Sequence, residues 1–418
     1  MLLLLVCINL TLAFMRPQEF IPELYGVPII PVAILACGVA WFFTNKNLEG
    51  PNGFLVLLFL LVTTFSHVAN GWFGGAADWL PLFGVTCVMF YFLAAASSST
   101  RNVRILMSIF VACGLAMVLH GFQQEFYGQG WTGEPPILGR IRYIGLLNDP
   151  NDLGLFLIMG LPFIFLFYSQ TRSILVKLFC ATSAAAYFYA FYLTESRGTI
   201  VAAVVMIGLM VLRRFGTVAV AAFMVPVMSL ATFLPERMRE ISASEESANI
   251  RVEAWYAGLQ MFESHLFFGV GAGRFAEFHG RTAHNTFLLV LSETGIIGFA
   301  VFIAIFGYSY FLMREAAFRR TVTEGGDVAA FEAEKATSTA LYYSLIGFLA
   351  AAFFLSRSYV VFPYLLCGMI TGYYTYLRSR DKSLKAFRLT QDLVMWAVYT
   401  LLGVLFLYLV VRVLLLAA

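Results

Sequence analysis

Residues 284–312 read HNTFLLVLSETGIIGFAVFIAIFGYSYFL and contain one acidic residue, Glu293, and no lysine or arginine. A helix that crosses the hydrocarbon core of a bilayer needs about 20 predominantly apolar residues, so this stretch predicts a transmembrane helix. The whole chain has the same character: 60% of its 418 residues are hydrophobic, 12% are charged, and the mean hydropathy is +0.81. Such a composition excludes a soluble domain of this length.

Comparable apolar runs recur along the chain with short polar breaks, which predicts an all-α polytopic integral membrane protein. We expect spans near residues 1–14, 27–43, 53–69, 79–96, 103–121, 151–168, 173–193, 198–213, 215–233, 284–312, 338–356, 359–377 and 390–415. The first run is short for a full crossing and is either re-entrant, interfacial or spanning. The prediction is therefore twelve or thirteen transmembrane helices.

Basic residues set the orientation, because cytoplasmic loops carry an excess of Lys and Arg. All five lysines fall in alternate connections, which we assign to the cytoplasm together with the N-terminus: Lys46, Lys177, Lys335, Lys382 and Lys385. The intervening, outward connections contain no lysine but ten arginines: Arg16, Arg140, Arg142, Arg197, Arg237, Arg239, Arg251, Arg274, Arg281 and Arg357. Ten arginines on the side that is usually poor in positive charge indicate a function there.

Three regions follow from this topology. Residues 1–234 form N-terminal transmembrane helices with an outward loop at 122–150, residues 235–283 form a large outward loop with short helices, and residues 284–418 form C-terminal transmembrane helices. Thr323–Ala336 reads as a cytoplasmic loop or short surface helix.

The six cysteines have no metal-ligand or paired spacing, and we expect neither a metal nor a cofactor. The net charge of +3 does not indicate nucleic acid binding.

The first informative outward segment runs from Gln123 to Asp152 and is rich in Pro and Gly, which excludes a long helix. Arg140 and Arg142 stand at alternate positions, which in an extended strand place both side chains on the same side. The Asn148–Asp152 stretch is typical of a turn followed by a helix cap.

The second segment is Thr194-Glu195-Ser196-Arg197-Gly198-Thr199, at an outer membrane boundary. Arg197 either extends to lipid phosphates or pairs with Glu195, or it points into a cavity of the bundle to bind an anion.

The third segment is the large loop. Residues 250–262 have the apolar spacing of an amphipathic helix that places Arg251 and Trp255 on one face. The GVGAGRF stretch, residues 269–275, superficially resembles a nucleotide-binding loop but lacks a preceding parallel strand. Its glycines are expected to let the backbone approach a ligand or the membrane surface. Arg274 follows, and His284 then opens the long apolar stretch.

These outward residues combine permanent cations with one titratable base. Arginine suits phosphate because its planar guanidinium stays charged and binds two oxygens at once. Neutral His284, with an ordinary pKa of about 6.5, is the candidate to take a proton from an attacking sugar hydroxyl. We expect Arg140 and Arg142 to contribute to a diphosphate site, with Glu195, Trp255, Arg274 and Asn285 in support.

Three spaced elements resemble the O-antigen ligase family: Thr194 to Gly198, Arg251 followed by Trp255, and His284-Asn285-Thr286 before a long span. That family belongs to a larger group with Wzy-type polysaccharide polymerases and protein O-oligosaccharyltransferases. The resemblance covers roughly Asn148 to Leu312. It implies a GT-C-like, metal-independent glycosyltransferase in the bacterial inner membrane, whose active site faces the periplasm.

The resemblance also implies the substrates and the roles of three residues. The donor is a glycan on undecaprenyl diphosphate, and the acceptor is a sugar hydroxyl of lipid A-core. Arg197 and Arg251 bind the diphosphate, and His284 acts as base or orients the acceptor.

Two alternatives remain. A Wzy-type polymerase uses the same donor with another lipid-linked glycan as acceptor, and its site looks alike. A transporter or flippase for a lipid-linked sugar places charges near the membrane midplane and often has repeat symmetry, whereas here the charges lie at span ends and no repeat is evident.

Overall fold

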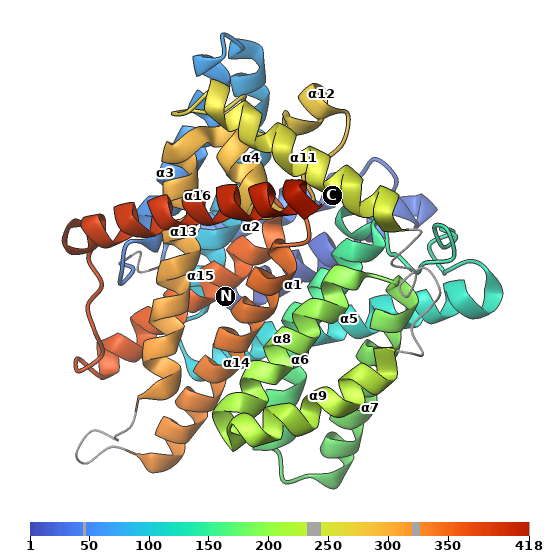
Figure 1. Ribbon diagram of the computed structural model, residues 1–418. Coiled ribbons are helices and arrows are strands. Elements are labelled where there is room, and N and C mark those ends of the chain that lie inside the picture. The colour runs from blue at the N-terminus through green and yellow to red at the C-terminus, as the bar shows by residue number, and fades with distance from the viewer. Residues whose placement is uncertain (45–46, 232–243, 320–326, 418) are drawn as a thin grey trace.

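The computed structural model describes residues 1–44, 47–231, 244–319 and 327–417. The described residues form fifteen α-helices and no β-strand (Figure 1). In chain order the helices are α1 (Leu2–Met15), α2 (Ile29–Phe42), α3 (Asn52–Ala69), α4 (Phe73–Ala96), α5 (Thr100–Tyr127), α6 (Pro150–Gln170), α7 (Ile174–Thr194), α8 (Arg197–Phe215), α9 (Thr217–Ala231), α11 (Ser244–Ser264), α12 (Phe275–His279), α13 (Thr286–Phe318), α14 (Val328–Ala352), α15 (Val361–Arg380) and α16 (Leu389–Ala417).

Each of the thirteen apolar runs corresponds to one of these helices. Nine described helices are long and apolar enough to cross a membrane, and α2 and α9 are apolar but shorter. The other two, α14 and α15, contain 25 and 20 residues and carry charged side chains near one end. The chain is therefore an all-α, multi-pass membrane protein, as predicted.

The expectation of a loop or short surface helix at 323–336 was wrong from Val328 onward, where α14 begins; residues 323–326 lie outside the described part. Asp327 caps α14 by accepting hydrogen bonds from the backbone N–H groups of Ala329 and Ala330, at 2.9 and 3.3 Å. An N-cap carboxylate satisfies otherwise unpaired donors, so the helix starts in this polar stretch well before the membrane.

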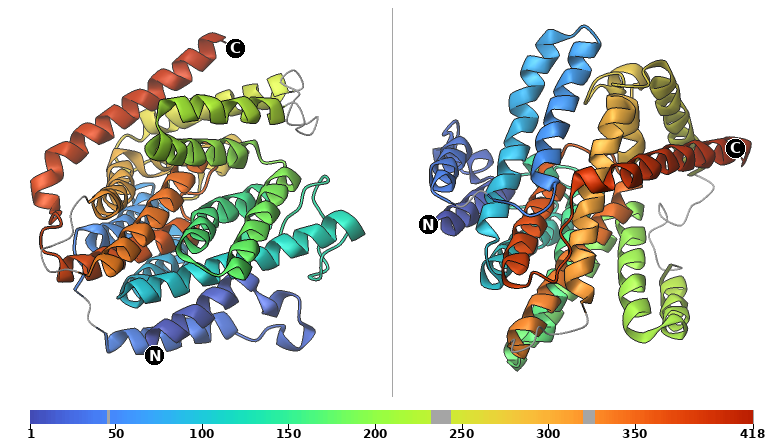
Figure 2. Two further views of the ribbon diagram at one scale, coloured as in Figure 1. Left: turned by 90° about the horizontal axis from the view of Figure 1, so that it is seen from below. Right: turned by 90° about the vertical axis from the view of Figure 1, so that its left-hand side faces the viewer.

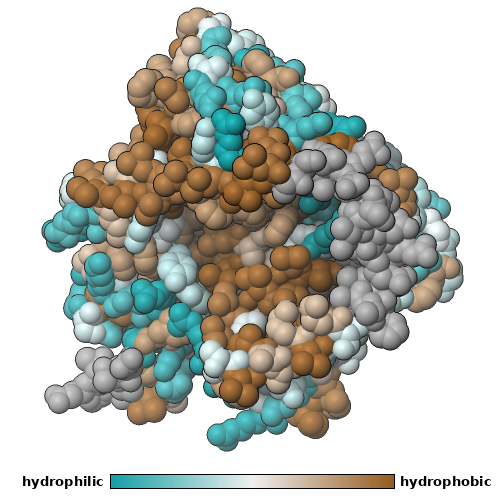
Figure 3. All heavy atoms as spheres, in the orientation of Figure 1, coloured by the Kyte–Doolittle hydropathy of each residue, from teal (hydrophilic) through white to brown (hydrophobic). Residues whose placement is uncertain are grey.

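The centre of the bundle is formed by α6 and α13, whose most apolar windows are 78% buried, and both helices pack against α14. Toward the edges, α1 packs on α2 and α5, and α16 packs on α13 and α11. Seen from below, α1 with α2 and α16 occupy opposite edges of the bundle (Figure 2). Apolar side chains run along α16 and across the middle of the face shown in Figure 3, while polar side chains gather toward the upper and lower parts of that face. This distribution fits a lipid-facing belt.

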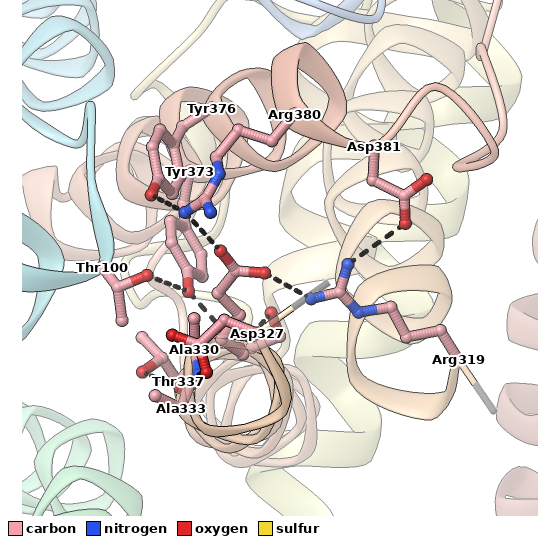
Figure 4. Close-up of polar contacts among 12 residues, drawn as sticks. Thr100, Arg319, Asp327, Ala330, Ala333, Thr337, Tyr373, Tyr376, Arg380 and Asp381 are labelled. Atoms are coloured by element: carbon pink, nitrogen blue, oxygen red, sulfur yellow. Dashed lines mark hydrogen bonds and ion pairs between the residues drawn. The ribbon is translucent and has the colours of Figure 1, made fainter. Parts of the chain in front are cut away.

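Contacts between residues far apart in sequence show which connections between helices lie together at each of the two ends of the bundle. At one end Arg378 pairs with Glu49 at 2.7 Å. At the same end Arg319 and Arg380, labelled in Figure 4, both pair with Glu334, at 2.7 and 3.0 Å. This is the end that we predicted to be cytoplasmic, and it contains the described lysines. At the opposite end the Asn70 amide donates to the Gly269 carbonyl at 2.8 Å, which joins the α3–α4 turn to the large loop.

Candidate active site

The corner between α7 and α8 presents Arg197 at the first position of α8. Glu195 ends α7 in a left-handed conformation, with φ 45°, and the Ser196 hydroxyl accepts a hydrogen bond from the Thr199 backbone N–H. The chain therefore reverses within two residues, and Arg197 follows at the end of the bundle that we predicted to face outward.

Arg140 and Arg142 have different partners, although they stand at alternate positions. The Arg140 guanidinium donates to the Thr194 carbonyl at 2.7 Å and to the Asn151 side chain at 3.0 Å. Arg140 thus joins the end of α7 to the start of α6. The Arg142 guanidinium instead pairs with Glu134 at 2.6 Å and donates to Asn148 at 2.7 Å, within its own loop. Arg142 has the contacts of a loop-stabilising residue.

His284 lies just before α13 in a left-handed conformation, with φ 51°. This conformation costs a non-glycine residue about 1–2 kcal/mol, so neighbouring contacts must stabilise it. On one side the Trp255 indole donates a 2.8 Å hydrogen bond to the Ala283 carbonyl. On the other side the Asn285 side chain caps α13 by accepting from the Leu288 backbone N–H at 3.0 Å. The two supporting residues therefore fix the backbone on either side of the histidine.

The connection between α14 and α15 brings a further arginine, Arg357, to this place. Its backbone N–H donates to the Thr286 hydroxyl at 2.9 Å, and the same hydroxyl donates to the Leu355 carbonyl at 2.5 Å. Its guanidinium forms an ion pair with Asp152 and lies 3.9 Å from the Asp149 carboxylate. Arg357 therefore connects the start of α6 with the start of α13.

The electrostatics of these elements favour an uncharged histidine. Burial, followed by the charges of Arg251 and Arg357, lowers the pKa of His284, and the nearby Asp149 carboxylate opposes the shift. Burial and the neighbouring Arg197 charge also lower the pKa of Arg251. An arginine whose pKa is lowered by a second arginine, next to a half-buried imidazole, forms a site suited to an anion and to proton transfer.

The glycine-rich stretch 269–275 packs on α13. The Glu293 carboxylate accepts hydrogen bonds from the backbone N–H groups of Gly273 and Phe275, at 2.9 and 2.8 Å. A Cβ at Gly269 would lie 2.3 Å from the Glu293 carbonyl carbon, so only glycine allows this approach. Gly269 thus lets the loop backbone approach the protein's own helix α13, whereas Gly273 faces the Trp79 ring.

Arg274 pairs with Glu277 at 2.8 Å, and its guanidinium lies 4.8 Å from the centre of the Trp72 ring. Of the predicted arginines, Arg251 acts on His284 and Arg197 acts on Arg251 through their charges. Arg140 contacts the α7–α8 corner, and Arg142 and Arg274 have ion pairs of their own. Arg237 and Arg239 lie outside the described residues. Within the described ranges, no group of three His, Cys, Asp or Glu side chains is placed to bind a metal ion.

Arg357 and its two aspartates are the residues that sequence reasoning did not assign to the site. Asp149 is the N-cap of α6, as the turn-and-cap interpretation predicted, and it accepts from the Asn151 N–H at 2.7 Å. The only local signal for Arg357 was its position as an arginine in a short outward connection.

Residues 155–303 match the sequence model of a protein family described as O-antigen ligase. No curated protein matches the chain. The matched region lies inside the stretch that carries the motifs and includes Arg197, Arg251 and His284, whereas Arg140, Arg142 and Arg357 fall outside it. The match indicates a transferase of the ligase or polymerase type that acts on glycans in a membrane. Residues 155–303 of this chain are thus similar to the O-antigen ligase family.

Proposed function

We propose that this protein transfers a glycan from an undecaprenyl-diphosphate carrier to a sugar hydroxyl of lipid A-core at the periplasmic face of the bacterial inner membrane. The single observation that carries the proposal is the chain of neighbouring charges from Arg197 to His284: after burial, the Arg197 charge lowers the pKa of Arg251, and the Arg251 charge in turn lowers the pKa of His284. Coupled cations of this kind favour an anionic ligand, and a diphosphate supplies the matching charge.

The proposed step is a displacement at the anomeric carbon of the donor. The acceptor hydroxyl oxygen forms the new bond to that carbon while His284 takes the hydroxyl proton. The bond between the anomeric carbon and the diphosphate oxygen breaks, and its electron pair leaves with the lipid diphosphate. Arg197 and Arg251 stabilise the charge that grows on this leaving group, which is the interaction that accelerates a reaction most directly.

Arg357 has a positioning role in this proposal. It lies between the aspartates at the start of α6 and Thr286, two residues after His284. Because its charge also lowers the pKa of His284, it helps to keep the imidazole neutral and therefore able to accept a proton.

A Wzy-type polymerase reaction needs the same donor and the same step, so the acceptor distinguishes the two activities. The test is to incubate the purified protein with a lipid-linked glycan and, in separate reactions, with lipid A-core or with a second lipid-linked glycan. Transfer to lipid A-core supports the ligase, and chain extension supports the polymerase. Transfer to neither acceptor, with donor binding intact, would reject both.

A further inference from the structure

A cavity of about 580 Å³ borders Arg357 and its neighbours in the α14–α15 connection. Its walls come mainly from α1, α2, α4 and residues 356–360, with further residues from α13 and α15, and most of its lining is apolar, including Ile34, Leu82, Phe83 and Met89. The volume falls in the range of about 300–1,000 Å³ that is typical of small-molecule sites. Such a cavity beside membrane-spanning helices is open to an apolar chain.

Polar atoms of this lining are buried and lack hydrogen-bond partners within the described part of the chain. They belong to the amide of Asn9, Nε of Arg16, Nε1 of Trp79 and Oγ of Ser356. Asn9 is 0% exposed and stands in α1, where lipid offers no hydrogen bonds in place of water. Buried polar groups in proteins are almost always satisfied, so these four residues call for a bound molecule with both donors and acceptors.

The charged residues of the lining indicate the charge of the bound molecule. The described lining residues include two arginines, Arg16 and Arg357, and no aspartate or glutamate. Arg16 pairs with Glu19 through one terminal nitrogen, at 2.7 Å, while its Nε atom has no partner in the described chain. A guanidinium has five donor hydrogens, so it can bind a carboxylate and a phosphate together.

The backbone conformation also helps to place Arg16 here. Arg16 ends α1 in a left-handed conformation with φ 50°, and a Cβ at Gly145 would lie 2.2 Å from its Cδ atom. Gly145 thus leaves the space that the arginine occupies, and any larger residue would displace it.

We propose that this cavity binds the phosphate-bearing end of a membrane lipid, with Arg16 and Arg357 at the phosphate, Asn9 at the adjoining polar groups and the apolar walls around the chain. The cavity shares Arg357 with the candidate active site, but neither Arg197 nor Arg251 is among its described lining residues, and the proposal does not depend on the proposed reaction. The phosphate belongs either to a phospholipid or to a polyprenyl phosphate.

The experiment is native mass spectrometry of the full-length protein in detergent, titrated separately with phosphatidylglycerol, phosphatidylethanolamine, a C55 polyprenyl phosphate and inorganic phosphate. Ala13→Phe fills the cavity from α1 and should abolish lipid binding. Asn9→Leu and Arg16→Gln should each weaken it by about tenfold, the effect of losing roughly 1.4 kcal/mol. Ile8→Phe, on the lipid-facing side of α1, and Arg412→Gln, on exposed α16, are the matched controls and should bind as the wild type does.

Preference for the polyprenyl phosphate or for a phospholipid identifies the source of the phosphate, and either result supports the site. Wild-type binding by Ala13→Phe, or binding of inorganic phosphate without any lipid, overturns it. Thermal unfolding of each variant establishes that it is folded; if Ala13→Phe is not, the nearly isosteric Asn9→Leu decides the question. Glycan transfer is measured separately, so loss of transfer with intact lipid binding counts against the proposed reaction alone.

Discussion

The indole Nε1 of Trp255 lies 2.8 Å from the carbonyl oxygen of Ala283 and donates a hydrogen bond to it. Trp255 is one helical turn after Arg251 in α11, and Ala283 directly precedes His284. One hydrogen bond therefore fixes the helix that carries a proposed diphosphate ligand relative to the proposed base. Trp255 is 8% exposed, so water competes little for this bond.

Replacing Trp255 by Phe removes this hydrogen bond and keeps an aromatic ring. We expect transfer to fall about fivefold, since a single hydrogen bond contributes roughly 1 kcal/mol. The measurement is kcat with a fixed lipid-linked donor. Trp396→Phe is the control, because the Trp396 indole packs against Tyr308 and Phe311 and not against the His284 connection. Equal rates for both variants would show that the Trp255 bond does not position His284.

His284→Ala should lower turnover by roughly a hundredfold or more, the usual contribution of general-base assistance, while donor binding survives. Turnover and donor affinity are measured on the same preparation. His265→Ala, which changes an exposed histidine just beyond the other end of α11, should leave both unchanged. Full activity in properly inserted His284→Ala protein would remove this residue from the mechanism.

Arg197→Lys and Arg251→Lys test whether geometry matters as well as charge. A lysine ammonium keeps the charge but cannot bind two phosphate oxygens with a planar fork. We expect each variant to lose transfer by at least about tenfold, nearly as much as the alanine variants. Arg412→Lys on exposed α16 should have no effect. If both lysine variants work at the wild-type rate, a lipid-anchoring role for the arginines is the better explanation.

The pH dependence of kcat should respond in opposite directions to two charge changes around His284. The neutral imidazole is the active form, so the rate falls as the pH drops through its pKa. The Arg281 charge lowers this pKa and the Asp149 charge raises it. Arg281→Gln should therefore move the acidic limb to higher pH, and Asp149→Asn, which keeps a good helix cap, should move it to lower pH. Unchanged limbs in both variants would mean that another group titrates.

Thiol labelling tests the orientation. In a cysteine-free background, Leu138→Cys, at a position 82% exposed, should react with an impermeant reagent added from the periplasm. Lys382→Cys, at the end that carries the lysines, should react only after the membrane is opened. The reverse pattern would place the candidate site on the cytoplasmic side.

The transmembrane helices could be predicted because the thickness of a bilayer imposes a length on apolar runs. Their ends could not be predicted equally well. The fifth run was expected at 103–121, whereas α5 spans Thr100–Tyr127, from a Ser99 cap that accepts the Asn102 N–H to Gly128 in a left-handed conformation. Hydropathy detects the apolar part of a helix, while caps and glycines decide where it begins and ends.

For the site, Arg197, Arg251 and His284 stood out because each belongs to a short local pattern. Arg357 did not, since its partner Asp152 is 205 residues away in sequence. The partner of Gly269 was out of reach for a related reason. A glycine-rich loop indicates that the backbone comes close to something, and only the fold identifies α13 as the partner of Gly269.

The packing of α16 over α11 has a consequence for biogenesis. Val411 of α16 is buried in one cluster with Trp255 and Leu259 of α11 and Leu288 of α13. The ribosome synthesises α16 long after α11. The apolar side of α11 that packs against α16 is therefore exposed while the intervening helices enter the membrane. A nascent chain halted before residue 389 therefore contains His284 but lacks the helix that covers the apolar side of α11. Translation through α16 is thus the step that completes this end of the bundle, and cells that stall earlier should produce an inserted but inactive, protease-sensitive protein.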